Sequence, residues 1–225
     1  MENGSDRRIS LPRGVYALCD DGLRPQLPLP QKASRLLEGG IRVLQLRMKR
    51  TVGRAALEAA QEVVRRCREA GAVCLINDRV DLALLAGAHG VHLGAEDLPP
   101  EAARTLLGPH RLIGVTVRSV AEIESAALAG ADYVGLGPVF ASRTKRLPVA
   151  PLGLEGFKAI ARTSQLPVVA ISGIGLDTLE AVASAGAHAA AMASELLLAD
   201  DIALRAGQLI RAFERGDPAR PSAIV

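Results

Sequence analysis

Aromatic residues are scarce in this chain, and tryptophan is absent. The 225 residues include two Tyr, three Phe and no Trp, so that 2% are aromatic although 49% are hydrophobic. Proteins that hold single-stranded nucleic acid normally stack its bases on aromatic side chains in a basic groove. The few aromatics and the mild formal charge of +3 therefore argue against a nucleic-acid partner and favour small anionic ligands. They also predict an aliphatic core.

Long hydrophobic runs and paired cysteines are missing as well. No stretch approaches the ~20 apolar residues that cross a membrane, and residues 1–9 lack the apolar segment of a signal peptide. Cys19, Cys67 and Cys74 are odd in number and show no CxxC spacing, which is typical of free thiols in a reducing compartment. We therefore predict a cytoplasmic protein with no membrane partner.

A short phrase recurs along the chain. Ala-Gly-Ala begins at residues 70, 86, 129 and 185, and Gly39-Gly40 is a looser copy. Each copy follows a helix-like stretch and precedes a short apolar run, so its glycine can end a helix in the left-handed conformation. Helices that alternate with continuous apolar strands are typical of a parallel sheet covered by helices.

Eight apolar runs alternate with eight helical segments. We expect strands at 15–19, 41–46, 72–76, 90–93, 111–116, 133–139, 167–171 and 188–193. We expect helices near 31–38, 53–70, 80–86, 100–107, 120–129, 154–163, 177–185 and 200–214. This pattern predicts an α/β fold, a single-domain (β/α)8 TIM barrel, a little shorter than the ~250 residues typical of that fold. We place the barrel at 13–215, a polar N-terminal segment at 1–12 and a disordered tail at 216–225.

Acidic side chains follow two consecutive predicted strands. Asp78 comes just after the third strand and Asp97 after the fourth. The carboxyl ends of neighbouring barrel strands meet at one rim, where these carboxylates could share a hard cation. Either residue alone could instead cap the helix that follows it. As a pair beside Arg47 and Lys49 they favour a magnesium site, since no His or Cys has the spacing of zinc ligands.

A basic and amide-bearing cluster ends the second predicted strand. Gln45, Arg47 and Lys49 alternate along the chain, so they project to one side, into the barrel mouth. Arg47 and Lys49 would face a polyanion there, although such a cluster could also be a solvated face. Gln45 suits a barrel interior if it hydrogen-bonds a heteroaromatic ring that carries an amino group, and Asn77 could share this contact.

The loops after the last three strands carry hydroxyls, glycines and a lysine. Residues 142–145 (Ser-Arg-Thr-Lys) can wrap an anion and exclude water, although an ordinary polar loop has the same composition. Gly173, Ala193 and Ser194 fall where barrels of this kind bind phosphate through backbone amides, although a turn glycine would look the same.

Two further polar residues lie within predicted strands. Thr116 ends the fifth strand and is expected to be free for a ligand contact at the same rim. His92 sits in an apolar run, so we expect a hydrogen-bonded core residue rather than a catalytic base.

Taken in order, these segments resemble the motifs of the thiamine phosphate synthase family from the first strand to the eighth. The matching segments are Gln45–Lys49, Asn77-Asp78, His92–Asp97, Gly114–Thr116, Pro138–Lys145, Gly153–Gly156 and Ser172–Ile174. The resemblance implies a magnesium-dependent transferase. Its reaction joins 4-amino-2-methyl-5-hydroxymethylpyrimidine diphosphate to a thiazole phosphate and releases thiamine phosphate and pyrophosphate.

The resemblance also implies a role for each matching residue. Magnesium would be held by Asp78 and Asp97. The catalytic residues would be Arg47, Lys49, Thr116 and Lys145. The pyrimidine diphosphate would be bound by Gln45, Leu46, Arg47, Met48, Lys49, Asn77, Thr116 and Lys145. The thiazole phosphate would be bound by Ser142, Arg143, Thr144, Gly173, Ala193 and Ser194.

The chain departs from the family pattern at a few of these positions. Met48 replaces the usual Glu, Ser172 replaces a Gly, and further differences lie at Ala95, 116–118 and 141–142. Two alternatives remain open: a thiazole tautomerase-like isomerase of the same barrel family, which relies on a His where this chain has Arg118, and a non-catalytic paralogue that binds thiazole or thiamine phosphates. The retained acids and Lys145 favour the synthase. The oligomeric state is left open, with a homo-oligomer as one option.

Overall fold

The computed structural model describes residues 9–141 and 149–219. Its strands are β1 (Gly14–Asp20), β2 (Val43–Arg47), β3 (Val73–Asn77), β4 (Gly90–Leu93), β5 (Leu112–Val117), β6 (Tyr133–Leu136), β7 (Val168–Ile171) and β8 (Ala189–Met192). Its helices are α1 (Leu29–Glu38), α2 (Gly53–Glu69), α3 (Val80–Leu85), α4 (Pro100–Leu107), α5 (Val120–Leu128), α6 (Gly153–Ala161), α7 (Leu176–Ser184), α8 (Ser194–Leu197) and α9 (Ile202–Gly216).

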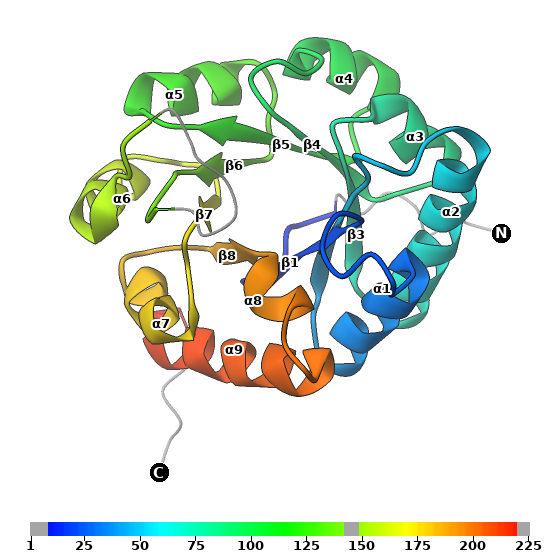
Figure 1. The fold of residues 1–225 in the computed structure, drawn as a ribbon. Helices are drawn as coiled ribbons and strands as arrows, with labels where there is room; N and C mark the ends of the chain where they lie inside the picture. The colour runs from blue at the N-terminus through cyan, green and yellow to red at the C-terminus, as the bar shows by residue number, and fades with distance from the viewer. Residues whose placement is uncertain (1–8, 142–148, 220–225) are drawn as a thin grey trace, which may run out of the picture.

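The strands form a closed parallel barrel in chain order. Each strand pairs with the next, and β8 returns to pair with β1, where Gly14 lies opposite Ala189. In Figure 1 the ring of strands is surrounded by helices, and α8 lies at the inner edge of the ring after β8. The predicted (β/α)8 TIM barrel is therefore confirmed, and the carboxyl ends of all eight strands meet at one rim.

Most element boundaries lie within two residues of the sequence expectation, and two differences are larger. Strand β6 ends at Leu136 rather than at residue 139, because Pro138 has no N–H with which to continue the ladder. The short helix α8 was not predicted at all. The last helix, α9, ends at Gly216. The next residue, Asp217, accepts a hydrogen bond from Arg13 Nη2 at 2.5 Å. Residues 1–8 and 220–225 of the predicted terminal segments lie outside the described residues.

Apolar side chains form two clusters, one on each face of the strand ring. The larger cluster fills the space between strands and helices, and the smaller one fills the barrel interior. Both tyrosines of the chain, Tyr16 and Tyr133, are fully buried in the inner cluster, with their ring centroids 6.2 Å apart. The core is mainly aliphatic, as predicted; its fully buried aromatic side chains are this central pair and, in the outer cluster, Phe157 and Phe213.

Gly114 of β5 gives the Tyr133 ring its place in the barrel. A Cβ atom at Gly114 would collide with the ring carbons and the hydroxyl of Tyr133. Similarly, a Cβ at Gly135 would lie 3.1 Å from Cε1 of His92. The two glycines therefore leave room for the rings of Tyr133 and His92 in the barrel interior.

Replacing Gly114 by Ala tests this packing. Because neither the backbone of β5 nor the fully buried ring can move away, Gly114→Ala should lower the free energy of unfolding by about 2–3 kcal/mol, as overpacked cores do. Urea denaturation measures the change. Gly156→Ala is the matched control, because its Cβ in α6 would meet only Leu152 Cβ at 3.4 Å, an ordinary contact. Equal stability of the two variants would contradict the packing argument.

Candidate active site

A pocket of about 500 Å³ opens at the carboxyl-end rim of the barrel. Seven residues that the sequence nominated line it: Gln45, Arg47, Asn77, Thr116, Gly173, Ala193 and Ser194. Others in its lining were not nominated, among them Tyr16, Leu18, Asp20, His92, Ile171 and Glu195. The floor is thus polar and the β7–β8 side more apolar, which suits a ring compound that carries anionic groups.

The two nominated carboxylates lie next to each other at the ends of β3 and β4. Asp78 has a positive φ of 63°, a conformation that costs energy in a residue other than glycine. Asp97 is held by the β4 loop, where its Oδ2 accepts a hydrogen bond from the Gly94 N–H at 2.6 Å. Neither residue caps a helix, since the N-cap positions of α3 and α4 are Arg79 and Pro99. The capping alternative is therefore wrong.

The carboxylates perturb each other's proton affinity. Burial raises the pKa of Asp97, and the neighbouring Asp78 charge adds to this, while the Gly94 N–H opposes it. Burial also acts to raise the pKa of Asp78, but the hydrogen bond from Lys49, the contact with Asp97 and the charges of Lys49 and Arg47 outweigh it, so that this pKa is lowered. Mutual repulsion of this kind is relieved by a cation.

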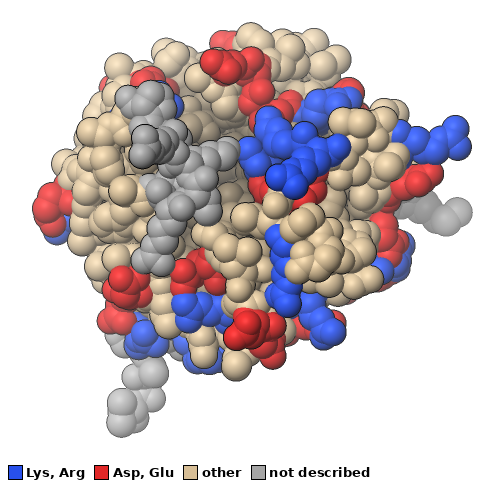
Figure 2. Space-filling view, in the orientation of Figure 1, with Lys and Arg blue, Asp and Glu red and all other residues tan. Residues whose placement is uncertain are grey.

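The nominated basic residues are paired with acids across the rim. Lys49 Nζ donates to Asp78 Oδ2, and Arg47 Nη1 donates to Asp20 Oδ2 at 2.5 Å. Figure 2 shows Lys and Arg side chains gathered on this face beside acidic ones, near the loops that follow β2 and β3. The alternative of a merely solvated basic face is thus wrong for Arg47, which is mostly buried and lines the pocket.

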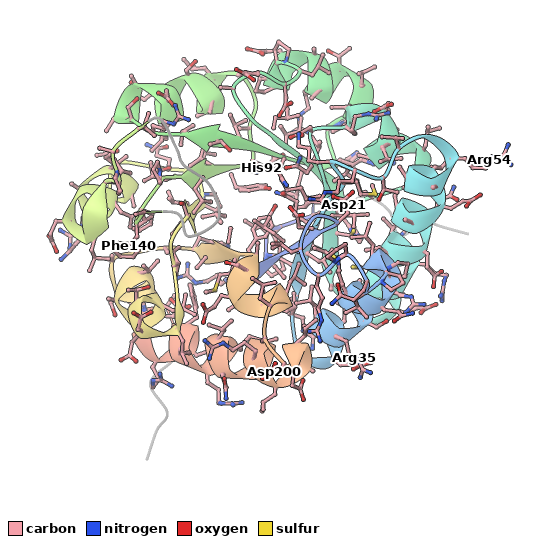
Figure 3. All side chains as sticks on the ribbon, in the orientation of Figure 1. Asp21, Arg35, Arg54, His92, Phe140 and Asp200 are labelled. Carbon is pink, nitrogen blue, oxygen red and sulfur yellow. The ribbon has the colours of Figure 1, made fainter. Side chains whose placement is uncertain are left out.

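Asp20 and Asp21 are functional candidates that the sequence reasoning missed. Asp21 accepts hydrogen bonds from the backbone N–H groups of Lys49, Arg50 and Thr51 at 2.7–3.1 Å, and these bonds lower its pKa although burial acts to raise it. Figure 3 shows Asp21 beside the loop after β1. Asp78 and Asp97 were nominated because each is an acidic residue just past the end of a predicted strand. The same signal would have nominated Asp20 and Asp21, which follow the first predicted strand. Together these two residues fix Arg47 and the loop that carries Lys49.

A chain of hydrogen bonds crosses the barrel beneath the pocket. Gln45 Nε2 donates to the Tyr16 hydroxyl at 2.8 Å, which lies 3.0 Å from the Tyr133 hydroxyl. The Tyr133 hydroxyl lies 3.0 Å from His92 Nδ1, and His92 Nε2 lies 2.9 Å from Thr116 Oγ1. Figure 3 labels His92 within the ring of strands. His92 is hydrogen-bonded as expected, but Thr116 is not free: it already contacts His92.

The loops after β7 and β8 form the other side of the pocket. Ser172 and Gly173 both have positive φ, 76° and 71°, and a Cβ at Gly173 would lie 2.6 Å from the Ala141 carbonyl oxygen. Ala193 precedes α8, which begins at Ser194. In barrels of this type phosphate is frequently bound by these loops and by the start of a short extra helix.

Some nominated residues do not reach the pocket with their side chains. Leu46 is fully buried between strands and helices, and Met48 packs partly buried against the same cluster. Any contact of Leu46 with a ligand would therefore be through its backbone. The nominated residues of the loop after β6 lie outside the described residues; they are Ser142, Arg143, Thr144 and Lys145.

No three His, Cys, Asp or Glu side chains within residues 9–141 and 149–219 are grouped to hold a metal ion. No helix in this part of the chain is both long and apolar enough to cross a bilayer.

The chain is similar to known proteins over most of its length. A family model described as thiamine monophosphate synthase matches residues 15–196. Thiamine-phosphate synthase from Myxococcus xanthus (strain DK1622) is 58% identical over 209 residues, 93% of this chain and 96% of that protein. The corresponding protein of Anaeromyxobacter dehalogenans (strain 2CP-C) is 49% identical over 84% of this chain and 85% of its own length.

A solved structure agrees with these sequence relatives. Thiamine phosphate pyrophosphorylase from Pyrococcus furiosus superposes with a TM-score of 0.82 at 33% identity, covering 90% of this chain and 96% of that one. The family model covers well over half of the chain. The chain belongs to the thiamine monophosphate synthase family.

Proposed function

We propose that this protein is a thiamine-phosphate synthase. The substrates would be 4-amino-2-methyl-5-hydroxymethylpyrimidine diphosphate and a thiazole phosphate, and the products thiamine phosphate and pyrophosphate. One observation supports this most directly: two adjacent carboxylates and two cations, Asp78, Asp97, Arg47 and Lys49, lie together at the carboxyl-end rim of the barrel, and Arg47 lines the pocket. The activity of its 58% identical relative supports the same conclusion.

The donor set at the rim fits magnesium better than zinc. Mg²⁺ prefers oxygen ligands and is commonly held by one or two carboxylates together with substrate phosphates and water. Asp78 and Asp97 would provide two such carboxylates, and the raised pKa of Asp97 reflects in part the repulsion that a cation relieves. Bound there, the metal would supply positive charge that neutralises the departing diphosphate.

The basic side chains would bind the diphosphate itself. Arg47 is held by Asp20 and lines the pocket, while Lys49 stands on the loop that Asp21 fixes. Lys49 can exchange Asp78 for a phosphate oxygen because its side chain is about half exposed, 51%. Thr116 and, from the loop outside the described residues, Lys145 would complete this anion site.

The organic parts of the substrates would lie deeper and toward β7–β8. Gln45 and Asn77 line the pocket wall where a pyrimidine ring would bind. Gly173, Ala193 and Ser194 would hold the thiazole phosphate, together with Ser142, Arg143 and Thr144. Ser172 has a positive φ, a backbone conformation that favours glycine. The Gly of the family pattern suits this position for that reason, and the serine departs from it.

The reaction needs no protein nucleophile. The bond between the pyrimidine methylene carbon and the diphosphate oxygen breaks, pyrophosphate leaves with the electron pair, and the thiazole nitrogen forms the new C–N bond to that carbon. The protein's part is to position both substrates and to stabilise the leaving anion.

The proposed reaction partners are phosphorylated small molecules. We place the protein in the reducing cytoplasm, which suits its three buried free thiols.

A coupled assay tests the proposed activity. Purified protein supplied with both substrates and Mg²⁺ should form thiamine phosphate and pyrophosphate in equal amounts, and chelation of the metal by EDTA should stop the reaction. Chromatography quantifies the first product and a phosphatase-coupled colour reaction the second. Failure to form product at high protein concentration, or isomerisation of the thiazole without pyrophosphate release, would overturn the proposal.

The metal role of Asp78 predicts a selective loss of activity. Asp78→Asn should lower kcat by about 100-fold or more, because one carboxylate charge for the cation is gone. Its melting temperature should change little, since Asp78 caps no helix. The control is Asp81→Asn, three residues on, which pairs with Arg79 on the exposed surface and should keep full activity. If Asp78→Asn retains near-normal turnover, or unfolds far more easily, Asp78 has a structural role instead.

A further inference from the structure

The five hydrogen-bonded side chains beneath the pocket come from five different strands. Gln45 lies on β2, Tyr16 on β1, Tyr133 on β6, His92 on β4 and Thr116 on β5. Both ends of the chain, Gln45 and Thr116, line the pocket, while Tyr133 in its middle is fully buried and does not. Tyr133 thus has no direct contact with a ligand in this arrangement, yet it joins the two ends.

Every member of the chain carries a fixed number of protons near neutral pH. The His92 ring is enclosed in the barrel with its two nitrogens facing the hydroxyls of Tyr133 and Thr116, surroundings that favour the neutral imidazole. Burial also raises the pKa of Tyr16 and of Tyr133, so both hydroxyls keep their hydrogens. A neutral imidazole donates from one nitrogen and accepts at the other. The chain can therefore run in one of two directions, but not in a mixture of both.

The direction follows from the Gln45 end. The Gln45 amide nitrogen donates to the Tyr16 oxygen, and Tyr133 is the other hydrogen-bond partner of that hydroxyl, so the buried Tyr16 hydrogen is satisfied when it goes to Tyr133. The Tyr133 hydrogen then goes to His92 Nδ1, which leaves the hydrogen of His92 on Nε2, directed at Thr116 Oγ1. Thr116 accepts this bond, and its own hydroxyl hydrogen remains available to the pocket.

The other end of the chain favours the same direction. An anion can only accept hydrogen bonds, so a phosphate oxygen at Thr116 requires that the threonine donate to it. If the chain of hydrogen bonds ran the other way, Thr116 would donate its hydroxyl hydrogen to His92 and direct its oxygen lone pairs toward the anion. The amide of Gln45 would then be reversed, presenting its NH2 group to the pocket.

We propose that the Tyr16–Tyr133–His92 chain is a polarised relay that makes Thr116 a hydrogen-bond donor and Gln45 Oε1 an acceptor in the pocket. Tyr133 is its central positioning residue. The relay selects a ligand that offers an N–H donor at one end and an anionic oxygen at the other, as an aminopyrimidine diphosphate does. This specificity rests on the proposed function, whereas the direction of the relay is a property of the protein alone.

The packing of the barrel is arranged around this relay. Gly114 and Gly135 lack the side chains that would otherwise occupy the places of the Tyr133 and His92 rings. The ring centroids of His92 and Tyr133 lie 5.5 Å apart, so each ring fixes the other. A hydroxyl at this depth is costly unless both its hydrogen and its oxygen find partners, and the relay supplies both.

The tautomer of His92 tests the relay directly. In ¹⁵N-labelled full-length protein, two-bond nitrogen–proton correlations distinguish Nε2–H from Nδ1–H imidazole, and a His92→Gln variant identifies the signals. The wild-type protein should show His92 protonated on Nε2 from pH 6 to pH 8. Tyr133→Phe removes the donor to Nδ1 and should give a mixture of tautomers. Tyr16→Phe keeps the Tyr133–His92 contact but removes the hydrogen that orients the Tyr133 hydroxyl, so it should also give a mixture of tautomers, whereas a purely local effect of Tyr133 would leave the Nε2–H tautomer unchanged.

Kinetics separate the relay from a purely structural role. Both tyrosine variants should lower kcat/KM for the pyrimidine diphosphate by roughly tenfold, through a higher KM, and leave the KM for the thiazole phosphate unaltered. His92 protonated on Nδ1 in the wild-type protein, or an unchanged tautomer in Tyr133→Phe, would overturn the proposal. The wild-type spectrum decides even if Tyr133→Phe does not fold. Absence of thiamine phosphate formation by the wild-type protein would instead refute the proposed function and leave the spectrum as the test of the relay.

Discussion

Compensation of opposite charges at the rim is the constraint on which the site depends. Parallel strands bring Asp20, Arg47 and Asp78 to the same edge of the barrel, where none of the three is more than about a fifth exposed. Charges held so far from water must be paired or neutralised by a ligand. The pairs Arg47–Asp20 and Lys49–Asp78 meet this need without substrate. The proposed magnesium diphosphate carries both signs of charge, so it would replace part of this pairing rather than add an unbalanced charge.

The same principle extends downward into the barrel, where hydrogen bonds take the place of ion pairs. The interior is apolar except for the hydroxyls, imidazole and amide that connect Gln45 to Thr116. Within the described residues no buried side-chain nitrogen or oxygen lacks a hydrogen-bond partner. The rim and the floor of the pocket are therefore preorganised by different interactions: Asp20 and Asp21 fix the basic side chains, and the tyrosines fix the neutral ones. Preorganised polar groups of this kind stabilise developing charge without rearranging during the reaction.

Much of this architecture was predictable from local sequence signals, and the missing parts have physical reasons. Repeated Ala-Gly-Ala turns and continuous apolar runs identified the barrel, and acids past strand ends identified Asp78 and Asp97. The tyrosine pair was missed because a strand pattern treats Tyr16 and Tyr133 as apolar. In addition, the two tyrosines lie 117 residues apart in sequence, so no local pattern shows that they contact each other. Thr116 was expected to be free for the same reason: its contact with His92 exists only after β4 and β5 pair.

The most direct test of the account is binding of a divalent ion together with pyrophosphate. Mn²⁺ reports by electron paramagnetic resonance on the sites that Mg²⁺ occupies, and it can be titrated with and without pyrophosphate into the wild-type protein and into Asp97→Asn. We expect one Mn²⁺ site that binds more tightly when pyrophosphate is present and that is lost or greatly weakened in the variant. Equal Mn²⁺ affinity in the two proteins would contradict the claim that the paired carboxylates hold the metal.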